Sequence, residues 1–177
     1  MNEIARLLSR LHETEGVRIL VIGGRGLEAH GIQRFTRDFD VLISESDMVT
    51  LARFLIRAGF EPLGENASFA RFRHESLLYE PIDVMKVSTP TMNMLWEDSV
   101  LLPAHEATLR APAAKSMTAL KLHALKQDPS RLSRDLPDII ALLQSSAATL
   151  SWDDFLALAA RYGPAGIAEK VRQLLQP

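Results

Sequence analysis

Apolar and polar positions near the start of the chain follow two different periods. Apolar residues first recur at helical spacing, which predicts an amphipathic helix over residues 2–14 that Gly16 ends. The continuous apolar run of residues 17–22 then predicts a buried strand. The chain is therefore expected to begin with a helix followed by a strand. The residues of the apolar helix face are Ile4, Leu7, Leu8 and Leu11.

Strand and helix patterns continue to alternate up to residue 90. A short helix is expected over residues 24–30, and another from a Ser46 cap to about Ala58. A turn at residues 64–66 is expected to join two strands. Further strands are predicted over residues 39–43, 60–63, 68–73 and 77–87.

Helical spacing dominates the sequence after Pro90. Residues 91–97 predict a short helix, and residues 100–110 fit a short strand pair. Longer helices are predicted over residues 112–127 and 133–144, from residue 151 onwards, and over residues 164–175.

Two serines are expected to start helices in this second part. Ser133 is predicted to cap a helix that has Pro137 in its first turn. Ser151 is predicted to cap the next helix, with Asp154 in the capping-box position. The chain thus divides into an α/β core, residues 1–110, and a helical subdomain, residues 111–177, which we expect to pack on that core.

The composition is that of a globular protein without a strong charge bias. The 177 residues suit one domain, with or without a small appendage, and 47% of them are hydrophobic. A net charge of -2 gives no overall basic field to attract nucleic acid, and leaves room only for a local basic patch. The absence of cysteine excludes disulfides and thiolate metal sites. No apolar run approaches the length of a membrane span, and a cytoplasmic protein is predicted.

A pair of aspartates gives the first indication of chemistry. Asp38 and Asp40 are separated by one residue at a predicted strand, so their carboxylates point to the same side. Two carboxylates held this close repel each other unless a cation lies between them or one is protonated. Mg²⁺ is typically bound by one or two carboxylates together with substrate phosphates. The pair therefore indicates a metal site.

A third aspartate could complete such a site. Asp83 lies in an otherwise apolar predicted strand, where burying a lone carboxylate is costly unless it is paired or bound to metal. Two metal ions held by three carboxylates can clamp a triphosphate and activate a hydroxyl for in-line attack.

These motifs resemble the nucleotidyltransferase fold of the DNA polymerase β superfamily. The chain is most similar to small bacterial members described as AbiEii-type toxins or minimal nucleotidyltransferases. The similarity rests on the Gly23-Gly24 pair, on Arg34-Phe35-Thr36-Arg37-Asp38-Phe39-Asp40, and on the later Asp83. Downstream it includes the Lys121 helix and the following Arg134-Asp135-Leu136-Pro137-Asp138 segment. The fold implied is α+β, with a nucleotidyltransferase-like mixed β-sheet flanked by helices and followed by a C-terminal helical segment.

The resemblance also implies roles for individual residues. Asp38, Asp40 and Asp83 would be catalytic and would hold two Mg²⁺ ions, with Asp83 accepting the proton of the attacking hydroxyl. The nucleotide phosphates of an NTP substrate would be bound by Gly23, Gly24, Arg25 and Lys121. The implied reaction moves a nucleoside monophosphate to a hydroxyl of RNA, protein or a small molecule. A cognate antitoxin is the implied partner, with no membrane association.

Alternative interpretations of the same residues remain open at the level of sequence. Gly24 stands where many active relatives have serine, which permits a catalytically inactive binding module or toxin–antitoxin component with the same fold. A phosphatase or sugar transferase with an Asp-x-Asp motif is a further alternative. Arg71 and Arg73 fit either a phosphate or nucleic-acid partner or an exposed sheet face. Arg134, Asp135 and Asp138 are most simply interpreted as helix-start charges and intrahelical pairs.

Overall fold

The computed structural model describes residues 2–103 and 108–175, which fall into two compact units. Unit 1 comprises Met1–Ala29 and Gln33–Pro112, and unit 2 comprises His30–Ile32 and Ala113–Pro177. The short segment from residue 30 belongs to unit 2, where the Ser145 hydroxyl donates to the His30 carbonyl at 2.6 Å. The expectation that the helical part packs on the core stays a prediction.

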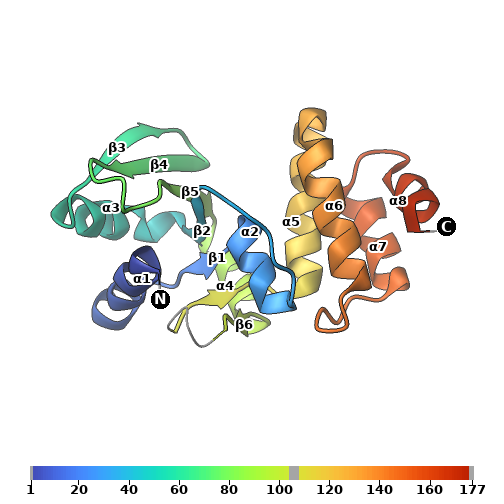
Figure 1. Ribbon diagram of the computed structural model, residues 1–177, viewed down its shortest axis with the longest axis horizontal. Helices are drawn as coiled ribbons and strands as arrows, with labels where there is room; N and C mark the ends of the chain where they lie inside the picture. The colour runs from blue at the N-terminus through green and yellow to red at the C-terminus, as the bar shows by residue number, and fades with distance from the viewer. Residues whose placement is uncertain (1, 104–107, 176–177) are drawn as a thin grey trace. The chain divides into compact units, whose positions relative to one another are not determined.

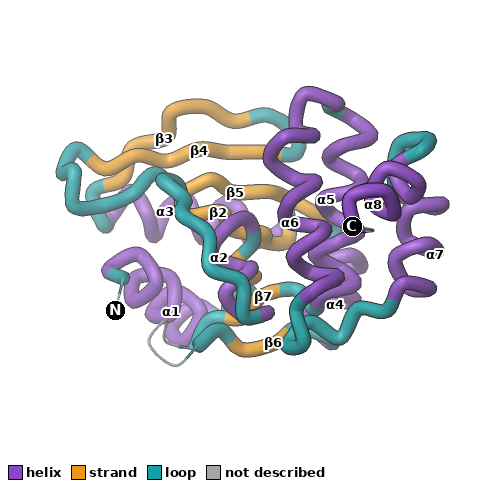
Figure 2. Tube along the Cα trace, turned by 45° about the vertical axis from the view of Figure 1, so that its right-hand side comes forward, coloured by secondary structure: helices purple, strands orange, loops and turns teal. Residues whose placement is uncertain are grey.

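Unit 1 is built on a seven-stranded mixed sheet in the order β3-β4-β5-β2-β1-β7-β6 (Figures 1 and 2). β2 pairs parallel with β5, β1 pairs parallel with β7, and the other pairs are antiparallel. This mixed sheet with helices confirms the predicted α+β fold class. The strands are β1 Leu20–Val21, β2 Phe39–Ser44, β3 Phe60–Glu65, β4 Phe69–His74, β5 Ile82–Val87, β6 Val100–Leu101 and β7 Arg110–Ala111.

Helices of unit 1 cover this sheet and complete its core. Asn2 caps the first helix by accepting from the backbone N–H of Ile4 at 2.8 Å, and Gly16, with φ +71°, ends it as predicted. Buried residues of the first and third helices, including Leu8 and Leu51, join strand residues such as Val41 in one hydrophobic cluster. The helices are α1 Glu3–Glu15, α2 Gly23–Gly26, α3 Met48–Arg57 and α4 Thr89–Glu97.

Unit 2 is helical and has a hydrophobic core of its own. Leu122, Ile139, Phe155 and Val171, one from each helix, are fully buried in it. Its helices are α5 Ala114–Gln127, α6 Leu132–Gln144, α7 Trp152–Tyr162 and α8 Ile167–Leu175. No helix in either described part of the chain, 2–103 or 108–175, is both long and apolar enough to cross a bilayer.

Two predicted helix caps are wrong. The Ser46 hydroxyl bonds to the hydroxyls of Ser44 at 2.8 Å and Thr89 at 3.4 Å, because a 3-10 turn over residues 45–47 precedes α3. Ser133 lies inside α6, because a 3-10 turn capped by Asp128 runs directly into that helix. The earlier start also moves Pro137 from the first turn into the helix interior.

Two strand boundaries also differ from the predictions. The strand expected from residue 77 begins only at Ile82, because residues 77–81 form a turn and a short link. The turn expected at residues 64–66 begins at Asn66, whose N–H donates to the Phe69 carbonyl at 2.8 Å, so Gly64 remains in β3.

The capping box at α7 gives a prediction about stability. Ser151 and Asp154 accept each other's backbone N–H, at 3.1 and 3.3 Å. We expect Ser151→Ala to lower the free energy of unfolding by about 1 kcal/mol, because a helix-end N–H loses its acceptor. Urea denaturation followed by circular dichroism measures this change.

Ser133→Ala is the matched control, since this exposed serine lies within a helix and caps nothing. It should change the free energy of unfolding by less than about 0.5 kcal/mol. Equal losses in the two variants would contradict the assignment of the caps.

Candidate functional site

Two of the predicted site aspartates lie directly opposite each other on neighbouring strands. The parallel pairing of β2 with β5 sets Asp40 against Asp83 in register. Their neighbours Phe39, Val41 and Val84 are fully buried, so alternation along the strands directs both carboxylates to the opposite side of the sheet. Residues more than forty positions apart in the chain are thus brought to one place by strand pairing.

The glycine pair allows the backbone to approach the Asp40 carboxylate. Gly23 has φ +64°, and a Cβ built on it would lie 2.0 Å from Oδ2 of Asp40. A Cβ on Gly24 would lie 3.0 Å from the Cβ of Thr36, a residue of the loop that leads to Asp38. Both positions therefore exclude larger side chains for steric reasons, in addition to the role in phosphate binding expected for them.

Asp38 and Asp83 share a cationic partner. Arg71 lies opposite Asp83 in the antiparallel pairing of β4 with β5. Its Nε and Nη2 donate to the two Asp83 oxygens at 2.6 and 3.0 Å, and the same Nη2 lies 3.6 Å from Asp38 Oδ2. The hydrogen bond to Asp83, followed by the nearby carboxylate charges, raises the pKa of Arg71 above its usual value. A two-pronged contact of this kind is among the strongest pairings that a carboxylate makes.

Arg71 is the residue of this cluster whose contact with the aspartates the sequence interpretation missed. The sequence pattern placed Arg71 on a strand with Arg73 and offered either a phosphate partner or an exposed face. Its contact with Asp83 follows from the pairing register of two strands, which hydrophobic periodicity does not specify. The signal available in the sequence was an arginine and an aspartate of opposite charge on consecutive predicted strands.

The donor chemistry of this cluster suits a divalent cation. Within residues 2–103 and 108–175, no three acidic or histidine side chains are arranged to hold one metal ion. Asp38 and Asp83 nevertheless both form ion pairs with one positive group, the Arg71 guanidinium. Carboxylate oxygens are the ligands that Mg²⁺ and Ca²⁺ prefer. The residues therefore fit a divalent cation in charge and donor type.

Arg25, expected to bind phosphate, has a carboxylate partner in this structure. Its guanidinium pairs with Glu80 and lies over the Phe39 ring, 5.3 Å from the ring centre. Asn2 also donates to Glu80, at 3.5 Å. The Nε of Arg25 is buried and bonded to nothing among the described residues. Arg25 thus helps to fix α2, the short helix that follows β1.

Lys121, expected to meet the leaving phosphates, lies in unit 2 and is buried. Its Nζ donates to Asp138 at 2.6 Å and to Asp135 at 3.3 Å, and Arg131 also contacts Asp135, at 2.8 Å. Asp135 lies in the first turn of α6 and pairs locally with Arg131, as the helix-start interpretation predicts. That interpretation did not predict that Asp135 and Asp138 are both buried and pair with Lys121 of α5. The Arg134 guanidinium remains half-exposed, 3.8 Å from Asp135.

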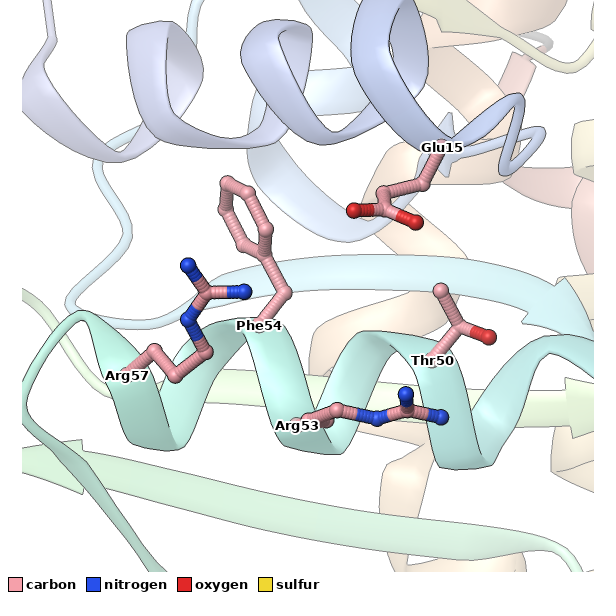
Figure 3. A pocket seen from close by; sticks show the side chains of 5 residues that line it. All are labelled: Glu15, Thr50, Arg53, Phe54 and Arg57. Carbon is pink, nitrogen blue, oxygen red and sulfur yellow. The ribbon is translucent and has the colours of Figure 1, made fainter.

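A separate hollow of about 80 Å³ lies in unit 1 between α1 and α3 (Figure 3). Glu15 reaches it from α1, and Arg53 and Arg57 project from successive turns of α3. None of the predicted site residues lines it, so it is distinct from the aspartate cluster.

The chain was compared with known families and structures. Residues 6–176 match the family described as "Nucleotidyl transferase AbiEii toxin, Type IV TA system". No curated protein matches.

Several solved structures are similar in fold. ANT(2'')-Ia, in complex with adenylyl-2''-tobramycin, aligns with a TM-score of 0.58 and 12% identity, over 97% of this chain and 91% of its own. The lincomycin-bound lincosamide adenylyltransferase LnuA aligns with a TM-score of 0.55 and 15% identity, over 77% of this chain and 93% of its own. An antigenic nucleotidyltransferase-like protein from Paracoccidioides brasiliensis aligns with a TM-score of 0.57 and 11% identity, over 97% of this chain and 91% of its own. At these identities the likeness shows a shared nucleotidyltransferase fold.

The contact between Gly23 and Asp40 gives a second prediction. Gly23→Ala is expected to lower the free energy of unfolding by about 1–2 kcal/mol, because alanine is strained at positive φ. The added methyl group must also displace the Asp40 carboxylate. Urea denaturation measures the change in stability.

Gly64→Ala serves as the control, since a Cβ there meets nothing within 4 Å. Its effect should stay within about 0.5 kcal/mol. If the two glycine variants were equally stable, the close approach of Gly23 to Asp40 would be excluded.

Proposed function

The chain belongs to the nucleotidyl transferase AbiEii toxin family and is an enzyme of that class, and we propose that its reaction depends on Mg²⁺. In this proposal a nucleoside monophosphate passes from an NTP to a hydroxyl acceptor, with release of pyrophosphate. The acceptor is RNA, a protein or a small molecule.

One observation carries the assignment of the site, namely the pairing of Asp40 with Asp83 across two parallel strands. Asp38 is tied to the same place through the guanidinium that it shares with Asp83. Arg71 supplies a single positive charge beside three carboxylates, so the cluster keeps a net negative charge that favours binding of divalent ions.

The proposed chemistry follows from the positions of these side chains. Asp38, Asp40 and Asp83 would hold two Mg²⁺ ions, which when bound neutralise charge on the triphosphate. Asp83 would take the proton from the acceptor hydroxyl as its oxygen attacks the α-phosphorus. The bond from that phosphorus to the bridging oxygen breaks, and the oxygen leaves with pyrophosphate. Catalysis in such transfers comes mainly from positioning and charge neutralisation.

The remaining predicted residues have supporting roles in this proposal. Gly23 and Gly24 leave room for the phosphates beside the backbone. Arg25 would contact phosphate oxygens in exchange for its present carboxylate partner, Glu80. The phosphate-binding role expected for Lys121 stays a prediction, because this side chain is buried in unit 2 with Asp135 and Asp138. Because the family is one of toxins, we further propose a cognate antitoxin as partner and the cytoplasm, which supplies NTPs, as the location.

Removing a single carboxylate tests the proposed reaction. We expect Asp40→Asn and Asp83→Asn each to lower nucleotide transfer by about 100-fold or more, because a ligand of the Mg²⁺ ions that would neutralise charge on the triphosphate is lost. The assay incubates the protein and Mg²⁺ with NTP labelled at the α-phosphate, cellular RNA and cellular protein. The labelled product identifies the acceptor class.

Asp98→Asn is the matched control, because Asp98 is an exposed aspartate at the end of α4 in the same unit. It should retain full transfer activity. Full activity of the Asp40 variant, or transfer that persists in EDTA, would refute the proposed site.

A further inference from the structure

The Arg71 guanidinium occupies both oxygens of Asp83, the atoms that a metal ion at this site would need. Its Nε and Nη2 contact the two oxygens separately, and Nη2 also lies nearest to Asp38. Because both Asp83 oxygens accept hydrogen bonds from Arg71, a second cation cannot bind them from the same side. Arg71 and a divalent ion therefore compete for the same ligands.

We propose that Arg71 is a built-in counter-cation of the metal site, which must release Asp83 and Asp38 before a divalent ion binds. This inference rests on the proposed function, because it takes the aspartate cluster as the metal site. It explains why the described residues show no ready metal cage although the aspartates lie together. The measured affinity for metal then depends on the difference between the free energies with which the carboxylates bind the divalent ion and Arg71.

The surroundings of Arg71 allow it to move. Its side chain is 41% exposed, whereas that of Asp83 is only 14% exposed, so the guanidinium can return to water while the carboxylate stays in place. On its other side Arg71 pairs in register with Gly64, where a Cβ would meet nothing within 4 Å. The strand next to Arg71 thus leaves open space, and β3 has a register irregularity between Pro62 and Gly64.

Charge balance favours the exchange of Arg71 for a divalent ion at the carboxylates. With Arg71 in place one positive charge offsets the three aspartates, and after its release a divalent ion supplies two. The phosphates that arrive with the metal offer the guanidinium a replacement partner that accepts the same two-pronged contact. Arg71 would thereby exchange a carboxylate for a phosphate when the nucleotide enters.

Measuring Mn²⁺ binding tests this proposal without any catalytic assay. The free Mn²⁺ signal in electron paramagnetic resonance is titrated with the wild-type chain, Arg71→Met and Arg73→Met. Arg73 is the matched control, an exposed arginine two positions along the same strand that, within residues 2–103 and 108–175, makes no ion pair with these aspartates. We expect Arg71→Met to bind Mn²⁺ roughly tenfold or more tightly than wild type, because a competing charge is removed. Arg73→Met should change the affinity less than about twofold.

Thermal melting provides a second readout in the same samples. Without metal, Arg71→Met should melt below wild type, since the carboxylates lose their partner, and Mn²⁺ should raise its Tm by more than it raises that of wild type. Arg71→Lys keeps the charge and loses the two-pronged contact, so it should bind Mn²⁺ more tightly than wild type by a smaller factor. It replaces the methionine variant if that one does not fold.

The outcomes separate this inference from the proposed function. Equal Mn²⁺ affinity in wild type and Arg71→Met would overturn the role of Arg71 while leaving the metal site standing. Failure of every variant to bind Mn²⁺ would overturn the metal site itself, and the role of Arg71 with it. If Arg73→Met bound Mn²⁺ as tightly as Arg71→Met, the inference would also be overturned, because loss of any nearby positive charge would then explain the gain in affinity.

Discussion

The site depends on a single constraint, the parallel pairing of β2 with β5. This pairing puts Asp40 against Asp83, although α3 and the β3–β4 hairpin separate the two strands in the chain. Because side chains alternate along a strand, a slip of one residue would turn one carboxylate toward the core. The buried residues on the opposite side, such as Val41 and Val84, fix the register and so fix the distance between the acids.

Neighbouring parts of unit 1 are fitted around these acids. The short helix α2, which follows β1, needs glycine at position 23 because Asp40 lies against it, and Arg25 of the same helix pairs with Glu80. β4 supplies the guanidinium that balances Asp83. The strands, α2 and the counter-charge therefore form one arrangement, in which the carboxylates stay together before any ligand arrives.

Local sequence patterns were sufficient for some elements and insufficient for others. The period of apolar residues and the Gly16 stop predicted α1, and the capping box predicted the start of α7, because these signals act within a few residues. Ser46 and Ser133 failed as caps because each competes with neighbouring turns, and a serine alone does not decide between them. The resemblance correctly indicated the fold.

For the candidate site, too, local sequence patterns predicted some features and missed those that depend on contacts between distant segments. Strand alternation predicted that Asp38 and Asp40 lie together, although β2 begins only at Phe39 and leaves Asp38 just before the strand. The contact of Arg71 with Asp83 could not be predicted in this way, because it arises from the register between two strands, which is settled by packing across the whole sheet. The burial of Asp135 and Asp138 was missed for a related reason, since their partner Lys121 lies on a different helix.

The buried charges of unit 2 have a consequence for how this chain diverges. Lys121 is enclosed with Asp135 and Asp138, so loss of the lysine alone removes the buried positive charge that both carboxylates share. An apolar replacement of the whole trio would be tolerated far better than loss of the lysine alone. Across evolution these three positions should therefore be kept or replaced jointly, which makes their covariation a marker of how α5 and α6 are aligned.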